Sequence, residues 1–178
     1  MSHTRVWTSL ALLGLLPLIA AAQPPRSSIP AGTKVERNLE YVKGGHERNK
    51  LDLYIPEKAD APLPVVVWIH GGGWRAGSKD RCPITWLAGK GYLVASINYR
   101  LLQHGEFPAQ IEDCKAAIRW LRANAKKYNL DPDRIGVMGA SAGGHLVALL
   151  GTSGHVKDLE GKGGNAEQSS RVQAVVDL

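Results

Sequence analysis

Runs of basic residues are missing from this 178-residue sequence, although its net charge is +6 and its pI is about 9.4. The lysines and arginines are scattered. No Lys/Arg-rich segment is interleaved with aromatic residues, which make up only 6% of the chain. Proteins that bind nucleic acid usually gather such charges in one patch. We therefore interpret the charge as that of a solvated surface and expect no nucleic-acid partner.

Internal repeats and low-complexity tracts are also absent, and the composition is not that of a disordered chain. Hydrophobic residues account for 44% of the sequence and charged residues for 21%, which is typical of a globular protein. The length suits one domain with a substantial core and is short for two domains.

A single long apolar run, LALLGLLPLIAAA, follows Arg5 near the N-terminus and ends in small residues. This pattern is typical of a secretory signal, and the run is too short for a comfortable membrane span. We predict cleavage near Ala22–Gln23, so that residues 1–22 are a signal peptide and the protein is secreted or periplasmic, with no stable membrane insertion after cleavage. An uncleaved anchor is the alternative. No lipobox-like cysteine follows the run, so a lipoprotein is not expected. Residues 23–33 read as a flexible lead-in.

Strand and helix patterns alternate along the rest of the chain. Residues 65–69 are all apolar, which favours a strand covered on both faces, as in a parallel sheet. This alternation predicts an α/β fold with right-handed crossovers. We expect strands over residues 34–44, 49–56, 64–70, 91–99, 135–138 and 172–178, helices over residues 79–90, 108–128 and 142–151, a turn at 131–134 and a loop at 160–170.

The segment MGASAGGH, residues 138–145, surrounds one serine with very small residues. It lies between a predicted strand and a predicted helix, where the pattern Gly-x-Ser-x-Gly is that of a nucleophile elbow. Ser141 is then expected at positive φ, with Gly139 and Gly143 avoiding collisions in the tight turn. The turn would place the N–H group of Ala142 beside the hydroxyl. Ser141 is therefore the predicted nucleophile.

A second glycine-rich motif, HGGGW, follows the buried strand directly and comprises His70, Gly71, Gly72, Gly73 and Trp74. Glycines can turn their N–H groups toward a ligand. Acyl transfer needs such donors where negative charge develops on the tetrahedral intermediate. We predict an oxyanion hole made by the N–H groups of residues 72, 73 and 142. The His70 side chain would fix the loop, and Trp74 would line a pocket or simply pack under the loop.

Several segments together resemble the α/β-hydrolase esterases of the hormone-sensitive-lipase-like group, in particular secreted bacterial bifunctional feruloyl and acetyl esterases. The resemblance covers residues 34–178. It rests on HGGGW, INYRLL, FPAQIEDCKAAIRWLRANA, YNLDPDRIGVMGASAGGHLVALLGTS and SSRVQAVVDL. It implies an α/β-hydrolase domain with a mostly parallel sheet flanked by helices, ester hydrolysis through a Ser–His–Asp triad, no cofactor and no metal.

The triad of this fold runs in the chain order Ser, then Asp or Glu, then His. The resemblance implies that both partners follow the last predicted strand, so we interpret residues 34–178 as the N-terminal part of a hydrolase domain that misses its last strands and helices. Several residues could be considered as substitutes. His145 as a base, His70 as a base and Asp177 as an acid are disfavoured alternatives, and Asp113 is expected to be an ion-pair partner. The remaining histidines at 46, 104 and 155 are expected in loops or at element ends.

The sequence contains only two cysteines, Cys82 and Cys114. Each is predicted on a helix, and in the resembled fold these helices cover opposite faces of the sheet. A disulfide requires Cα atoms within about 7 Å of each other, so we predict two free thiols.

The functional prediction is a secreted serine carboxylesterase acting on short acyl or feruloyl esters, free or attached to polysaccharide. One alternative is a non-catalytic fragment or binding module that keeps half of a site. Another is an acyl hydrolase that cleaves amide, formamide or peptide bonds.

Overall fold

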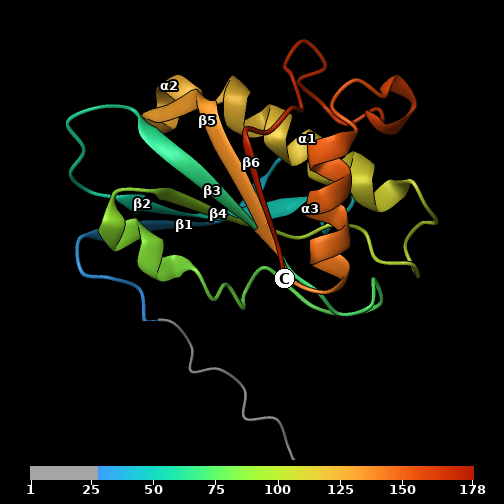
Figure 1. Cartoon of the computed structure of the whole chain (residues 1–178), viewed down its shortest axis with the longest axis horizontal. Coiled ribbons are helices and arrows are strands. Elements are labelled where there is room, and N and C mark those ends of the chain that lie inside the picture. Colours follow the sequence, from blue (N-terminus) through green and yellow to red (C-terminus); the bar gives the residue numbers. More distant parts are fainter. Residues whose placement is uncertain (1–27) are drawn as a thin grey trace, which may run out of the picture.

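The computed structural model describes residues 28–178, so the predicted signal peptide and residues 23–27 of the lead-in lie outside the described residues. Six strands form one mixed sheet in the order β1-β2-β4-β3-β5-β6 (Figure 1). Their bounds are β1 Thr33–Glu40, β2 Lys50–Pro56, β3 Leu63–Ile69, β4 Leu93–Ile97, β5 Leu130–Gly139 and β6 Ala174–Asp177. The predicted α/β fold is confirmed.

Strand direction changes twice across the sheet, because β2 alone runs opposite to the other five strands. β1 and β2 are antiparallel to each other, and β2 is antiparallel to β4. The pairs β4–β3, β3–β5 and β5–β6 are all parallel. Every residue of β4 is buried, as expected for an apolar strand covered on both faces. The carboxyl ends of β3 and β5 therefore meet at one edge, where both glycine motifs begin.

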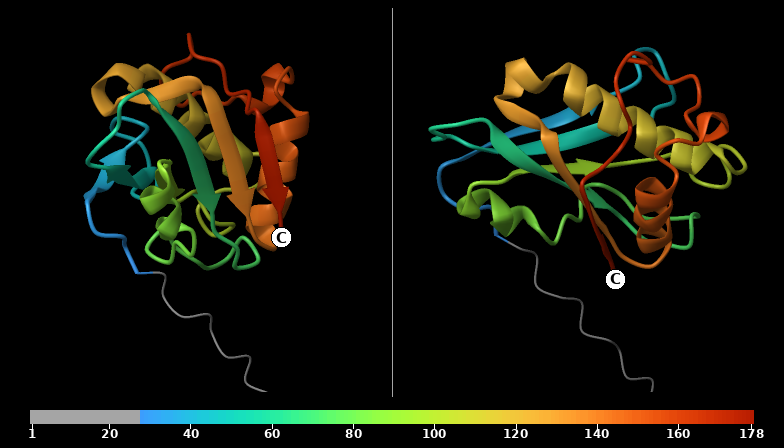
Figure 2. Two further views of the ribbon diagram at one scale, coloured as in Figure 1. Left: turned by 60° about the vertical axis from the view of Figure 1, so that its left-hand side comes forward. Right: turned by 45° about the horizontal axis from the view of Figure 1, so that its top comes forward.

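Helices cover the two faces unequally. The helices α1 (Ala109–Ala123), α2 (Ala125–Tyr128) and α3 (Ala142–Thr152) lie on one face, over the larger apolar core. The opposite face carries the short 3-10 helix η1 (Thr85–Lys90) over a smaller cluster, and Figure 2 shows the sheet between these two layers. A second 3-10 turn, η2 (Lys157–Leu159), lies in the long connection from α3 to β6. Among residues 28–178, no helix is both long enough and apolar enough to cross a bilayer.

The helix predicted over residues 79–90 is wrong in its first half. Residues 79–84 form a loop and only residues 85–90 are helical. Lys79 is buried and its ammonium group lies 2.8 Å from the Asp52 carboxylate. Its backbone N–H donates to the Asn98 side chain at 2.7 Å. These tertiary contacts hold the segment in a non-helical path with turns at residues 79–80 and 83–84, and Pro83 has no N–H for a helix interior.

The turn predicted at residues 131–134 lies inside β5. Leu63 pairs with Leu130, whereas Val65 pairs with Ile135, so the register slips and the extra residues bulge outward. The backbone N–H of Asp133 donates to the Asp131 carboxylate at 2.9 Å, which is the local turn bond that the sequence suggests. The helix predicted over 108–128 is interrupted at Asn124, whose side chain donates to the Trp120 carbonyl at 2.9 Å and ends α1.

Cys82 and Cys114 do not form a disulfide, as predicted, and both are buried. Cys114 belongs to the core under α1, and Cys82 belongs to the cluster on the η1 face. They therefore lie on opposite faces of the sheet, although Cys82 sits in the loop before η1 and not on a helix.

Candidate active site

Ser141 occupies the sharp turn between β5 and α3. Its backbone lies at φ 56° and ψ −119°, a region that a residue with a Cβ rarely adopts. A Cβ on Gly143 would overlap the Ile69 carbonyl oxygen, and a Cβ on Gly139 would overlap the Gly143 carbonyl oxygen. The small residues around Ser141 are therefore required by close backbone packing, as the elbow pattern predicts. The serine itself is exposed to solvent.

The HGGGW loop leaves β3 directly beside this turn. A Cβ placed on Gly71 would lie 2.6 Å from the Ala140 carbonyl oxygen and 3.3 Å from the Ser141 Cβ, so the two motifs are in contact. The next two residues, Gly72 and Gly73, have φ of 115° and 58°. A Cβ on Gly72 would also overlap the backbone of Ala76. Glycine is thus required at both steps of the turn.

Three backbone N–H groups in the glycine loop and at the start of α3 have no hydrogen-bond partner among the described residues. In the part of the chain that the structure describes, the N–H groups of Gly72, Gly73 and Ala142 make no hydrogen bond to another residue. Ala142 is also the first residue of α3, whose positive dipole end adds to the attraction for an anion. This arrangement can stabilise negative charge on an oxygen bonded to a carbon that Ser141 attacks.

Trp74 ends the glycine turn in a strained conformation. Its φ is 58°, which is exceptional for a bulky residue. Its ring makes an edge-on contact with the exposed His145, with ring centroids 5.5 Å apart and an interplanar angle of 86°. The His145 ring is therefore held by Trp74, one helical turn beyond Ser141.

His70 is buried and both of its ring nitrogens have partners. Nδ1 lies 2.8 Å from the Gly71 carbonyl oxygen, and Nε2 lies 3.2 Å from the Arg48 guanidinium. Burial lowers the pKa of His70 to about 4, although the hydrogen bond to Gly71 acts in the opposite direction. The ring fixes the loop, in line with its predicted role, and cannot accept a proton from Ser141.

Within residues 28–178, the Ser141 hydroxyl forms no hydrogen bond with a histidine. Asp113 is buried and paired with the Arg100 guanidinium at 2.8 Å, which confirms the predicted ion pair. Asp177 ends β6, and a Cβ on Gly144 of α3 would overlap its carboxylate. The described residues therefore supply a candidate nucleophile and unpaired N–H donors without a general base in place.

One group of side chains in the described chain could offer three metal ligands. His46, Glu47 and His104 bring one ligand atom each within 4.8 Å of the others. However, Nδ1 of His46 accepts from the Arg48 backbone N–H at 3.1 Å, and Nδ1 of His104 accepts from the Leu101 N–H at 3.2 Å. In a neutral ring this leaves the proton on Nε2, where a cation would have to bind. The group therefore gives no support to a metal site.

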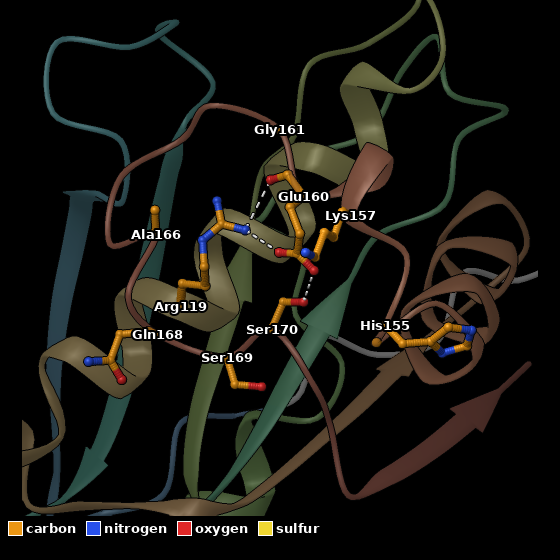
Figure 3. A pocket seen from close by; sticks show the side chains of 10 residues that line it. Arg119, His155, Lys157, Glu160, Gly161, Ala166, Gln168, Ser169 and Ser170 are labelled. Atoms are coloured by element: carbon orange, nitrogen blue, oxygen red, sulfur yellow. Dashed lines mark hydrogen bonds and ion pairs between the residues drawn. The ribbon is translucent and has the colours of Figure 1, made fainter.

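A cavity of about 290 Å³ lies in the connection between α3 and β6. Figure 3 shows the Arg119 and Ser170 side chains converging on Glu160, with His155 at one side. The Glu160 carboxylate binds Arg119 at 2.6 Å, Ser170 at 2.6 Å and the buried Lys115 ammonium at 2.8 Å. This connection joins the C-terminal end of α3 to the start of β6, whereas Ser141 lies at the other end of α3 (Figure 1). We interpret this ion-pair network as a structural one that holds the connection between α3 and β6 against α1.

Three residues that fasten the glycine loop were not singled out from the sequence. Arg48 contacts His70, the Tyr99 hydroxyl donates to the His70 carbonyl at 2.9 Å, and Lys79 is anchored on Asp52. The first two come from turns or strand ends distant in the sequence, and no local pattern marks them. Tyr99 belongs to the INYRLL segment, which contributes to the family resemblance, but the sequence suggested no role for this residue.

Comparisons with known proteins agree with this geometry. The sequence model of the BD-FAE family matches residues 51–178. The probable isoprenylcysteine alpha-carbonyl methylesterase ICMEL2 of Arabidopsis thaliana is 35% identical over 132 residues, which are 73% of this chain and 31% of that protein.

Two solved structures are similar over most of the chain. The bifunctional GH43-CE protein of Bacteroides eggerthii has a TM-score of 0.76 and 42% identity, over 80% of this chain and 22% of that one. A truncated form of a carbohydrate esterase from gut microbiota has a TM-score of 0.76 and 37% identity, over 81% of this chain and 55% of that one. The chain thus spans about a third of the curated relative.

Proposed function

Because the chain belongs to the BD-FAE family of α/β-hydrolase esterases, we propose that it carries the nucleophilic half of a serine carboxylesterase site acting on short acyl or feruloyl esters. The observation that carries the proposal is the set of free N–H groups at Gly72, Gly73 and Ala142 around the strained Ser141. A binding module would need neither a strained serine nor unpaired N–H donors in a loop that packs against it.

The chemistry follows from this placement. The Ser141 oxygen forms a bond to the ester carbonyl carbon, and the carbonyl oxygen becomes an anion that the three N–H groups stabilise. A general base takes the proton of the Ser141 hydroxyl and gives it to the alcohol as the bond between the carbonyl carbon and the alcohol oxygen breaks. Water, deprotonated by the same base, then cleaves the acyl-serine ester and releases the acid and the Ser141 hydroxyl. One oxyanion donor contributes about 3–4 kcal/mol to the transition state in enzymes of this kind.

The base and its orienting acid are proposed to come from sequence beyond residue 178. The Ser141 backbone N–H donates to the Leu178 carbonyl at 2.8 Å, so a continuation of the chain would start beside the nucleophile (Figure 1). The triad order of the fold requires the acid and the histidine after the serine. On this proposal residues 1–178 alone are nearly inactive.

A substrate attached to polysaccharide is favoured because one similar structure is a carbohydrate esterase. The test is a panel of p-nitrophenyl acetate, methyl ferulate and acetylated xylan, with p-nitroacetanilide as the amide. Measurable turnover of the esters and none of the amide supports the proposal. Preference for the amide would replace it with amide hydrolysis.

Reaction of the natural full-length protein with diethyl p-nitrophenyl phosphate tests the nucleophile independently of the substrate. Mass spectrometry should find the phosphoryl group on Ser141 alone. A protein that binds esters but is never labelled would instead be a binding module.

Export is a separate proposal, based on the sequence of residues 1–22. N-terminal sequencing of the exported protein should begin at Gln23. Retention of the intact N-terminus in the membrane fraction would indicate the uncleaved anchor.

A further inference from the structure

Arg48 lies in the turn between β1 and β2, yet its guanidinium reaches the glycine loop. Its Nε–H donates to the Tyr99 carbonyl at 2.8 Å. One terminal nitrogen donates to the Gly77 carbonyl at 2.9 Å and lies 3.2 Å from Nε2 of His70. A single side chain therefore ties two points of the loop to the end of β4.

The contact with His70 determines where the proton of that ring lies. A guanidinium can only donate hydrogen bonds, so Nε2 of His70 must accept. The proton of the neutral ring is then on Nδ1, which donates to the Gly71 carbonyl at 2.8 Å. Gly71 in turn packs against the Ser141 turn. This gives a continuous path from Arg48 through His70 to the nucleophile.

The ring has no freedom to take another orientation. It stacks on Tyr99 with centroids 4.5 Å apart and an interplanar angle of 16°. A Cβ on Gly77 would overlap Nδ1 of His70 and the Gly71 carbonyl oxygen, so the loop closes tightly over the ring. The direction of the Gly71 peptide, and of the N–H groups that follow it, depends on which ring nitrogen carries the proton.

We propose that Arg48 is a positioning residue of the active site: it holds His70 in the Nδ1–H tautomer and thereby fixes the loop that bears Gly72 and Gly73. The role rests on the proposed acyl transfer, because the loop matters only if it binds an oxyanion. Arg48 touches neither the nucleophile nor the substrate and acts through His70.

Electrostatics support the same assignment. Burial and, to a smaller extent, the charge of Arg48 together lower the pKa of His70 to about 4, whereas the hydrogen bond to Gly71 and the charge of Asp80 act to raise it. The stacked Tyr99 stays neutral because burial raises the pKa of its hydroxyl. A protonated ring would turn an N–H toward the guanidinium, so the arrangement is stable only with the neutral ring.

The direct test is NMR of the ring nitrogens of His70 in the natural full-length protein, a readout that does not depend on enzymatic activity. We expect the Nδ1–H tautomer in the wild type down to about pH 5. In Arg48→Met, mixed tautomers and a His70 pKa closer to its ordinary value of about 6.5 are expected. Arg48→Lys keeps a donor and should retain most of the Nδ1–H form. Arg134→Met is the matched control, since Arg134 pairs with Asp131 away from the loop.

Kinetics of the natural full-length protein provide the second readout. Arg48→Met should lower kcat about 10-fold or more with KM changed less than about threefold, and Arg48→Lys should restore part of the loss. The proposal is overturned if Arg48→Met folds and leaves the tautomer unchanged, whatever its stability. If the NMR result is as expected but Ser141→Ala stays active, the proposed function fails while the coupling of Arg48 to His70 stands.

Discussion

At the scale of one residue, Gly143 explains why the neighbours of Ser141 have very small side chains or none. In Gly143→Ala the new Cβ would meet the carbonyl oxygens of Ile69 and His70, which are backbone atoms that cannot swing away. Alanine gains about 1 kcal/mol over glycine inside a helix, but the overlap outweighs this. We expect a loss of about 2 kcal/mol or more in the free energy of unfolding, measured by urea denaturation.

Gly164→Ala is the control for this substitution. A Cβ there would meet nothing within 4 Å, and the residue has an ordinary φ. Its stability should stay within about 0.5 kcal/mol of the wild type. Equal losses in the two variants would contradict the packing described for the elbow.

His70 should make folding stability depend on pH. Its pKa is about 4 in the folded protein, against 6.5 for an ordinary histidine, so the unfolded chain takes up a proton first as the pH falls. The contribution of His70 is present above about pH 6.5 and is lost as the pH falls to about 4, by about 3 kcal/mol in total. Denaturant titrations of the wild type and of His70→Asn, which keeps an N–H donor for Gly71, should show this difference.

The difference between the stability of the wild type and that of His70→Asn isolates the contribution of His70, because the carboxylates are the same in both proteins. If the stability curves of wild type and His70→Asn run parallel between pH 6.5 and 4, His70 is not a buried neutral ring.

At the scale of elements, the ion-pair network between α1 and the α3–β6 connection depends on Glu160. Lys115 and Arg119 are almost fully buried, and both bind this carboxylate. Glu160→Gln would leave two buried cations facing a neutral amide. Since Glu160 itself is about one-third exposed, we expect a loss of about 2–3 kcal/mol, less than for a fully buried pair. Thermal unfolding measures this loss, and Asp158→Asn, which removes the charge of an exposed carboxylate in the same connection, should leave the stability unchanged.

Most elements were predictable because their patterns are local. The apolar run at 65–69 and the elbow at Ser141 carry their structure in adjacent residues, and both were predicted correctly. The prediction of a helix before Thr85 was wrong because Lys79 forms an ion pair with Asp52, which belongs to a segment distant in the sequence. The bulge at Asp131 kept its predicted turn bond, yet the sheet continued through it.

The candidate site divides in the same way. Ser141 and the glycines around it can be recognised from their spacing in the sequence, because the strained turn requires small residues at fixed positions. Arg48 cannot be recognised in this way, because its role depends on a contact with His70, which is 22 residues away in the sequence. A supporting residue of this kind becomes visible only when the fold brings the turn and the loop together.

At the scale of the whole molecule, β6 is an edge strand of the sheet within residues 28–178, as β1 is at the opposite side. It pairs with β5 on one side only, and Val175 and Val176 are 40% and 45% exposed. An apolar unpaired edge is a template for association. Residues 1–178 alone should therefore form concentration-dependent aggregates in light scattering, and Val176→Lys should reduce them. A monodisperse monomer at about 100 μM would contradict this expectation.

The most direct test of the account is the initial rate of p-nitrophenyl acetate hydrolysis by the natural full-length protein and by its Ser141→Ala variant. Removing the nucleophile of a triad leaves only the catalysis due to the oxyanion hole and binding. We predict that Ser141→Ala lowers kcat by at least about a thousandfold while the protein remains folded. A folded Ser141→Ala variant that keeps the wild-type rate would show that the ester is cleaved elsewhere, and would contradict the assignment of the elbow as the catalytic centre.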